Sequence, residues 1–333
     1  MKTVLKWVLG MVLVAVAGVG SYVLFLALKT PKTAVPITIK VVLTPERVAR
    51  GRYLTHVVVD CFACHAERDF SRFGGPIIPG REGVGGPLPL EGFPGILVVP
   101  NITPDPETGL GAWSDGEILR AFREGIGRDG RALFPLMPYP YYRHMSDEDA
   151  EAMVAYLRSL PPVKKKQAPT KINFPVNLFI KSVPEPVGSV PAPNRVDRVA
   201  YGRYLVTIAA CKECHTQADR GAPIPGKDFA GGRLFAMAGS PLRVYTANIT
   251  PDNDTGIGVW TEERFIHKIR SYQPYADGEA PKVGPESFTL MPWLALCHMA
   301  DDDLKAIYAY LRTVKPVYNS VETYQGLGSE SRN

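Results

Sequence analysis

The sequence predicts a mainly α-helical protein in which an N-terminal transmembrane helix precedes two tandem helical domains. Three observations lead to this prediction: a long uncharged apolar segment at the N-terminus, an internal duplication, and a cysteine motif that occurs once in each copy. The predicted division of the 333-residue chain is an anchor (1–28), a linker (29–44), a first domain (45–160), a Pro-rich linker (161–199), a second domain (200–318) and a C-terminal tail (319–333).

The anchor is predicted from residues 7–28, which contain no charged side chain. At a rise of about 1.5 Å per residue this segment is about 33 Å long as a helix, enough to cross the hydrocarbon core of a bilayer. Lysines flank it on both sides, so the flanking charge leaves its orientation open. The "AVA" at 15–17 is compatible with a signal-peptide cleavage site, but the apolar run continues well beyond it. We therefore favour a retained anchor over a cleaved signal peptide.

The formal net charge of +5 is unevenly distributed along the chain. Residues 45–160 carry 12 basic and 16 acidic side chains, and residues 201–333 carry 14 and 15. The positive balance therefore lies in the N-terminal segment and in residues 161–200, not on either domain. This distribution argues against nucleic-acid binding. A basic linker is compatible with a nearby anionic membrane surface.

The two domains are predicted to share one fold because the two halves of the chain align in order. The matching segments are "RGRYLTHVVVDCFACH" (50–65) with "AYGRYLVTIAACKECH" (200–215), "NITPDPETGLGAW" (101–113) with "NITPDNDTGIGVW" (248–260), and "LMPYPYYRHMSDED" (136–149) with "LMPWLALCHMADDD" (290–303).

Each domain is predicted to contain a few helices separated by long loops. A short helix leads into the cysteine motif, and a second helix begins at Ser114 or at Thr261, where polar caps precede acidic residues. The last helix begins near Ser146 or Asp301 and has one apolar face. The predicted buried faces are Ala150, Met153, Val154 and Leu157 in the first domain and Leu304, Ile307, Tyr308 and Leu311 in the second. Long Gly- and Pro-rich loops are compatible with a core that a non-protein group fills.

The motifs "CFACH" (61–65) and "CKECH" (211–215) hold four of the five cysteines. Four interpretations compete. A chain of this length needs no disulfide staples, and the flanking sequence lacks the βαβ context of a thioredoxin-like redox pair. A closed zinc site requires ligands from two chain segments, and no second pair lies nearby in either domain.

Covalent haem fits both motifs. Two thiols three positions apart reach the two vinyl groups of one porphyrin, and the adjacent histidine binds the iron. The sequence therefore predicts two covalently bound haem c groups, held by Cys61, Cys64, Cys211 and Cys214, with His65 and His215 as iron ligands. Haem of this type is attached on the outer side of the bacterial cytoplasmic membrane. This places both domains on the periplasmic side and the N-terminus inside.

The second axial ligand is predicted to be Met137 in the first domain and Met291 in the second. Each lies in an "LMP" segment before the last helix, where the proline keeps the chain extended. The alternative is that both methionines only fill apolar gaps. Other recurring candidates are interpreted as structural: Met145 and Met299 as residues packing on a helix start, and His144 and His298 as solvated side chains. The unmatched Cys297 is interpreted as a buried structural thiol.

The repeated "NITPD" segments suggest a second set of haem contacts. Our hypothesis is that these residues line the pocket and bind the propionates, the alternative being a turn that positions the tryptophan for packing. The residues are Asn101, Thr103 and Trp113 in the first domain and Asn248, Thr250 and Trp260 in the second. The two haem motifs also differ internally, Phe62–Ala63 against Lys212–Glu213, which suggests that the haem edges face different neighbours.

These motifs together resemble the membrane-associated multihaem cytochrome c subunits of bacterial alcohol and gluconate dehydrogenases. The resemblance extends from about Glu46 to Val317. It implies class I cytochrome c domains with His/Met haems, and Met137 and Met291 occupy the family's ligand position. The family usually has three CxxCH motifs and this chain has two, so the resemblance does not identify a dehydrogenase partner.

The predicted function is that of a membrane-anchored dihaem electron-transfer protein without catalytic residues of its own. It would pass electrons between a periplasmic or membrane redox complex and another carrier, with the N-terminal helix in lipid and one or more redox proteins as partners. The alternative is a dihaem peroxidase, which needs one iron with an open site. Both domains offer a methionine at the same place, which argues against that alternative.

Overall fold

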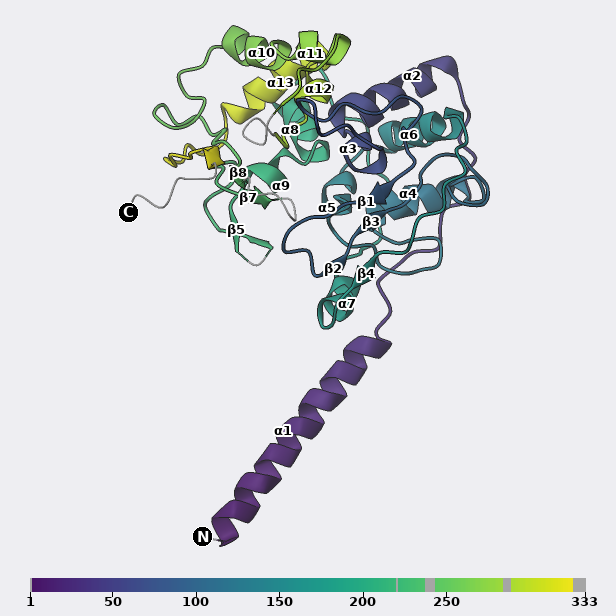
Figure 1. Cartoon of the computed structure of the whole chain (residues 1–333), viewed down its shortest axis with the longest axis vertical. Helices are drawn as coiled ribbons and strands as arrows, with labels where there is room; N and C mark the ends of the chain where they lie inside the picture. Colours follow the sequence, from purple (N-terminus) through teal and green to yellow (C-terminus); the bar gives the residue numbers. More distant parts are fainter. Residues whose placement is uncertain (1, 220, 237–242, 284–288, 326–333) are drawn as a thin grey trace.

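The computed structural model describes residues 2–219, 221–236, 243–283 and 289–325. A long helix, α1 (Lys2–Leu28), leads through an extended segment into a globular part with two lobes (Figure 1). The predicted mainly helical fold with an N-terminal apolar helix is therefore confirmed.

Helix α1 projects away from the globular part (Figure 1). By length and composition it can cross a membrane. Leu26 is its only buried side chain, so almost the whole apolar surface of α1 is exposed in the isolated chain. A helix that is apolar all round and not covered by protein is typical of a membrane anchor or of a signal sequence.

Each lobe is built on the crossing of its first and last long helices. In the first lobe α2 (Pro45–Tyr53) crosses α6 (Asp147–Ser159), and in the second α8 (Arg198–Ile208) crosses α13 (Asp301–Leu311). A Cβ on Gly51 would lie 1.8 Å from the Ala152 carbonyl oxygen, and one on Gly202 would lie 1.8 Å from the Ala306 carbonyl oxygen. Both crossings therefore require glycine, because any side chain would force the helices apart.

The predicted helix starts are confirmed. Helix α4 (Asp115–Glu124) begins after Ser114, which forms a capping box with Glu117 in its first turn, and α10 (Glu262–Arg270) follows Thr261, whose hydroxyl accepts from the Arg264 N–H. The predicted faces of the last helices are buried, except that Tyr308 is half-buried.

The two lobes contact each other through reciprocal tyrosines. The Tyr53 hydroxyl donates to Asp303 Oδ2 (2.7 Å) and accepts from the Ala300 N–H (3.0 Å). At the aligned positions, the Tyr204 hydroxyl donates to Asp149 Oδ2 (2.6 Å) and accepts from the Ser146 N–H (3.3 Å). Each tyrosine therefore caps the last helix of the opposite lobe, as expected of a pseudo-two-fold interface.

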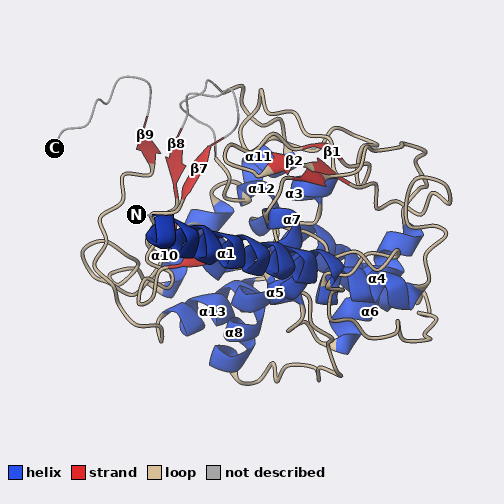
Figure 2. Cartoon of the chain, turned by 90° about the horizontal axis from the view of Figure 1, so that it is seen from below, coloured by secondary structure: helices blue, strands red, loops and turns tan. Residues whose placement is uncertain are grey.

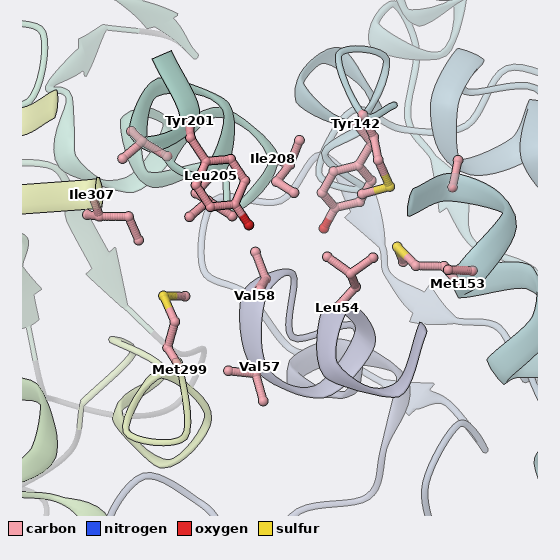
Figure 3. Close-up of a cluster of buried hydrophobic side chains, with 14 of the residues drawn as sticks. Leu54, Val57, Val58, Tyr142, Met153, Tyr201, Leu205, Ile208, Met299 and Ile307 are labelled. Atoms are coloured by element: carbon pink, nitrogen blue, oxygen red, sulfur yellow. The ribbon is translucent and has the colours of Figure 1, made fainter. Parts of the chain in front are cut away.

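One hydrophobic cluster joins both lobes behind these caps (Figure 3). Leu54, Val57 and Val58 from the first lobe face Leu205, Ile208 and Met299 from the second. A continuous apolar core of this kind makes the two lobes one packed unit.

The linker differs from the extended spacer that its prolines suggest. It wraps the first lobe and is tied to it along its length: the Gln167 side chain donates to the Val84 carbonyl (2.8 Å), and Thr170 Oγ1 donates to the Val98 carbonyl (2.7 Å). Further on, Ser189 Oγ donates to Asp147 Oδ2 (2.6 Å). Prolines stiffen the linker, but these side-chain hydrogen bonds decide its path.

The remaining elements are short, and most of the chain between them is loop (Figure 2). The helical turns are a π-helical turn (Leu54–Val58), α3 (Phe62–His65), α5 (Tyr139–Tyr142), α7 (Val176–Phe179), a 3-10 turn (Ile180–Ser182), α9 (Cys211–His215), α11 (Gln273–Asp277) and α12 (Trp293–Leu296). The antiparallel strand pairs are β1 (Gly86–Pro87) with β3 (Val98–Val99), β2 (Gly95–Ile96) with β4 (Lys171–Ile172), and β5 (Ala218–Asp219) with β6 (Ala222–Pro223). A fourth sheet has three strands, β7 (Leu234–Ala236), β8 (Arg243–Tyr245) and β9 (Tyr324–Gln325).

Candidate haem-binding sites

A residue with left-handed backbone lies immediately before each cysteine motif and ends the preceding helix. Asp60 has φ 47° and Ala210 has φ 52°. Left-handed backbone is strained in residues other than glycine, and such strain is concentrated at functional sites. The turn leaves the thiols of Cys64 and Cys214 exposed at the surface of their lobes.

The motif histidines are buried and fixed in one orientation. His65 Nδ1 donates to the Pro100 carbonyl (2.9 Å), and His215 Nδ1 donates to the Ala247 carbonyl (2.7 Å). A carbonyl only accepts, so Nδ1 carries the proton in both rings and Nε2 keeps its lone pair for a metal. Burial lowers the pKa of both rings, that of His65 to about 4. Both histidines are therefore neutral near pH 7, which is the state that binds iron.

Two glycines that sequence reasoning missed hold these histidines. The Gly85 N–H donates to the His65 carbonyl (2.9 Å), and the Gly231 N–H donates to the His215 carbonyl (2.8 Å). Both glycines have left-handed φ values, and a Cβ at either would lie 2.6 Å from the carbonyl oxygen that accepts from the histidine ring. The signal available in the sequence is a Gly–Gly pair that precedes each "NIT" segment.

The cysteines form neither disulfides nor a zinc site in the part of the chain that the structure describes. All five are free thiols. Among the described residues, no group of three or more His, Cys, Asp or Glu side chains is arranged to hold a metal ion. A thiol pair with an adjacent neutral histidine matches the donor set for covalent haem, because the porphyrin supplies the other four iron ligands. The residues therefore fit haem c.

Met137 and Met291 occupy equivalent turns. Each is half-buried, and its carbonyl accepts from the second residue after it, at 2.7 Å from the Tyr139 N–H and at 2.8 Å from the Trp293 N–H. Iron ligation by these methionines stays a prediction. The other recurring methionines, Met145 and Met299, are fully buried in the apolar cluster.

The remaining candidates also have the structural surroundings expected of them. His144 and His298 are exposed. Cys297 is fully buried and donates to the Leu294 carbonyl, and burial raises the pKa of its thiol to about 11.

The "NIT" asparagines serve the protein's own backbone. Asn101 Oδ1 accepts from the Thr103 N–H (2.9 Å), and its amide nitrogen donates to the Val163 carbonyl (2.8 Å) and to Thr108 Oγ1 (3.1 Å). The same three contacts recur in the second lobe at 3.0, 2.8 and 2.9 Å, made by Asn248 with Thr250, Val317 and Thr255. These bonds use both amide hydrogens, which favours the structural turn over propionate binding for the asparagines.

The tryptophans have surroundings better suited to an anion. Trp113 lines a surface depression with Arg128, Arg131 and Asp129, and the carboxylate of Asp129 forms an ion pair with Arg131 (3.2 Å). Trp260 lines another with Lys268 and Arg264, whose guanidinium lies 4.9 Å from the ring centroid. Cationic side chains therefore accompany the tryptophan in both lobes, and the propionate hypothesis stays a prediction for these two residues.

The residues between the two cysteines of each motif make contacts with other side chains of the protein. Phe62 is fully buried and packs edge-on against His56, with ring centroids 4.6 Å apart. Lys212 forms an ion pair with Asp228 (2.6 Å), and Glu213 forms one with Arg233 (2.6 Å). Phe62 thus belongs to the core of its lobe, whereas Lys212 and Glu213 form ion pairs nearer the surface, and the hypothesis that the haem edges face different neighbours stays a prediction.

The two motifs also lie near each other, which sequence reasoning missed. The Tyr141 hydroxyl of the first lobe donates to Glu213 Oε2 of the second motif (2.9 Å). Burial, and then the proximity of Cys61, Cys64 and Cys214, raises the pKa of the neighbouring Tyr142 well above its ordinary value. The charges of cysteines from both motifs therefore act on one phenol. No local signal predicts this, because the tyrosines of α5 have no counterparts in "PWLAL" of the second lobe.

Comparison with known proteins places these sites in a family context. The family model described as Cytochrome c matches residues 48–161 and 199–315. The chain is 30% identical over 284 residues to the alcohol dehydrogenase (quinone) cytochrome c subunit of Gluconobacter oxydans, covering 81% of this chain and 55% of that protein. It is 32% identical over 283 residues to the gluconate 2-dehydrogenase cytochrome c subunit of Pantoea cypripedii, covering 80% and 59%. A dihaem c-type cytochrome of Cereibacter sphaeroides is 29% identical over 220 residues, covering 60% and 72%. The chain thus spans little more than half the length of the two dehydrogenase subunits.

Proposed function

The chain belongs to the cytochrome c family, and from that premise we propose that it is a membrane-anchored dihaem electron carrier. Haem c supplies reversible one-electron chemistry at iron. The observation that carries the proposal is the duplicated site, in which an exposed thiol adjoins a buried, neutral histidine whose Nε2 is free in both lobes. Cys61 and Cys64 would hold one group and Cys211 and Cys214 the other.

The protein's own part in electron transfer is to hold the two sites close together. The shared hydrophobic cluster and the reciprocal tyrosine caps make the lobes one unit. Tyr141 and Tyr142 lie between the two motifs. We infer that electrons pass between the two sites inside one chain, so that donor and acceptor can dock at different lobes.

The cellular placement is also part of the proposal. Helix α1 would remain as a single-pass anchor, with both lobes on the periplasmic side of the cytoplasmic membrane. Protease treatment of spheroplasts is expected to remove the lobes while leaving cytoplasmic proteins intact. Recovery of the whole chain in the soluble fraction, beginning after residue 17, would show a cleaved signal peptide instead.

The partner is proposed by chemical class. The similar proteins named above are cytochrome subunits of dehydrogenases or a dihaem cytochrome. We propose that this chain likewise receives electrons from a dehydrogenase subunit and delivers them to another carrier. None of these relatives is named a peroxidase, and the peroxidase alternative therefore has no support.

Haem counting tests the central proposal. The full chain, expressed in a host with a c-type cytochrome maturation system, is expected to carry two haems per chain in a pyridine haemochrome assay. Replacing Cys61 and Cys64 by serine is expected to leave one haem, as is the matched replacement of Cys211 and Cys214. A chain that matures with no covalent haem refutes the proposal.

A further inference from the structure

The part of the globular body that touches the end of α1 is the segment 171–183, which contains β4, α7 and the following 3-10 turn (Figure 1). Lys29 Nζ donates to Ser182 Oγ (2.9 Å), and Lys181 Nζ donates to the Ala27 carbonyl (2.7 Å). Lys181 thereby places a cation at the C-terminal end of α1, where the helix dipole favours it. These contacts thus hold segment 171–183 beside the C-terminal end of α1.

Large apolar side chains of this region point away from the protein. Leu178 and Ile180 are buried, at 8% and 9% exposure, and secure the segment to the body. Phe179, which lies between them in the chain, is 50% exposed, and Phe174, earlier in the segment, is 65% exposed. Ile96, whose strand β2 pairs with β4, is 60% exposed. We call the exposed set Ile96, Phe174, Phe179 and Val183 the apolar face.

The segment that bears most of the apolar face carries only positive charge: residues 171–184 contain Lys171 and Lys181 and no acidic residue. The next acidic residue, Glu185, forms an ion pair with Arg143, and Lys164 and Lys165 form ion pairs elsewhere on the first lobe. Lys29 and Lys181 lie at the end of α1 itself. Exposed aromatic and aliphatic groups surrounded by lysines are the composition of a surface that enters the headgroup region of an anionic bilayer.

We propose that the apolar face and its lysines form a second membrane-contact surface, which binds the anionic lipid surface next to the point where α1 enters it. The proposal rests on the proposed function in one respect, that α1 spans the bilayer. A membrane is favoured over a protein partner because the contacts of Lys29 and Lys181 hold this surface at the depth where α1 leaves the hydrocarbon. The consequence is that the haem lobes are held against the membrane with a fixed tilt.

Nitroxide depth measurements test this on the full, haem-loaded chain in nanodiscs containing phosphatidylglycerol. A label is placed by Phe179→Cys, by Val259→Cys as a control of similar exposure (61%) on the second lobe, and by Val16→Cys within α1 (63% exposed). The unsubstituted chain gives the labelling background, since Cys297 is fully buried. The measured quantity is the ratio of label accessibility to oxygen, which enters lipid, over accessibility to a water-soluble nickel chelate.

We expect a several-fold higher ratio at position 179 than at 259, and a decrease at 179 when phosphatidylglycerol is replaced by phosphatidylcholine. A lipid-like ratio at 16 together with a water-like ratio at 179 overturns the second contact surface and leaves the anchor standing. A water-like ratio at 16 overturns the anchor and with it this proposal. Protection of position 179 from both reagents, in nanodiscs and in detergent alike, overturns the proposal in favour of a protein contact.

Discussion

His56 shows how one side chain behind a haem motif makes stability depend on pH. Its ring packs edge-on against Phe62, and its Nε2 lies 2.6 Å from the Tyr156 hydroxyl. Burial, and to a lesser extent the charge of Arg52, lowers the pKa of His56 to about 4. A histidine whose pKa falls on folding favours the folded state above its unfolded pKa of about 6.5 and loses that contribution as the pH falls toward 4.

We therefore expect His56→Gln to flatten the stability profile between about pH 6.5 and pH 4. The glutamine keeps a hydrogen-bonding group for Tyr156 but does not titrate. Over this interval the native chain should lose on the order of 2 kcal/mol more stability than the variant. Denaturant unfolding at a series of pH values, followed by circular dichroism, measures the difference. Parallel profiles for the two proteins would contradict the assignment to His56.

The proposed methionine ligands make a second prediction at the residue scale. Met137→Leu keeps the volume of the side chain but removes the thioether, so one haem should lose its sixth ligand and its potential should fall by on the order of 0.1 V. Met291→Leu should act on the other haem alone, and Met145→Leu, which alters a fully buried core methionine, on neither. Spectroelectrochemical titration resolves the two potentials. Unchanged potentials in both ligand variants would assign these methionines to packing.

At the scale of elements, the two carboxylates that accept from the interlobe tyrosines differ in their other hydrogen-bond partners. Asp149 also binds Arg50 through two 2.8 Å contacts, and Ser146 caps its helix. Asp303 is 7% exposed, and the N-cap residue of its helix is Ala300, whose side chain cannot cap the helix. Loss of the tyrosine hydroxyl should therefore matter more for Asp303.

We expect Tyr53→Phe to destabilise the protein by about 2–3 kcal/mol and Tyr204→Phe by about 1 kcal/mol, because Asp149 keeps its two contacts with Arg50 after the hydroxyl is lost. Chemical denaturation of the full chain in detergent measures both values. Tyr204→Phe serves as the matched control for removing a hydroxyl at this interface. An equal loss in the two variants would show that Asp303 gains no more from its tyrosine than Asp149 does.

Helix starts were predictable and the contacts between elements were not. The capping box at Ser114 and the apolar face of α6 involve residues a few positions apart, so local pattern determines them. Tyr53 and Asp303 are 250 positions apart, so no local pattern indicates that they meet. The wrapped linker also depends on distant contacts, such as Gln167 with Val84. Proline content indicated stiffness but carried no information on that path.

For the whole molecule, the proximity of the two motifs predicts magnetic interaction between the two ferric haems. Cys64 and Cys214 are both exposed thiols, and Tyr142 lies near both. We expect the haem attached to the first motif to relax faster in the native chain than in the Cys211→Ser/Cys214→Ser variant. Microwave power saturation in electron paramagnetic resonance measures this. Equal saturation would mean that the haems lie too far apart for the proposed internal transfer.

The duplication predicted two similar lobes, and the family match bears this out. The motif residues could be predicted because their spacing is local. That the two sites face each other could not be predicted, since it depends on the hydrogen bond between Tyr141 and Glu213. The residues at the aligned positions of the other lobe are Ala295 and Ala63, which cannot form this bond. Repetition in sequence indicates what each lobe is, but only packing shows how the lobes are paired.

The reciprocal tyrosine caps carry a consequence for the history of the chain. Tyr53 reaches across to the other copy's helix, and Tyr204 returns the same contact, which is the relation between two subunits of a symmetric dimer. Such a surface forms naturally between two separate molecules before any covalent connection exists. Tandem duplication of a gene for a symmetric dimer would place such an interface inside one chain. The second lobe has Ala300 where the first has Ser146, so the Tyr53 hydroxyl is the side-chain group that binds the N–H at that helix start.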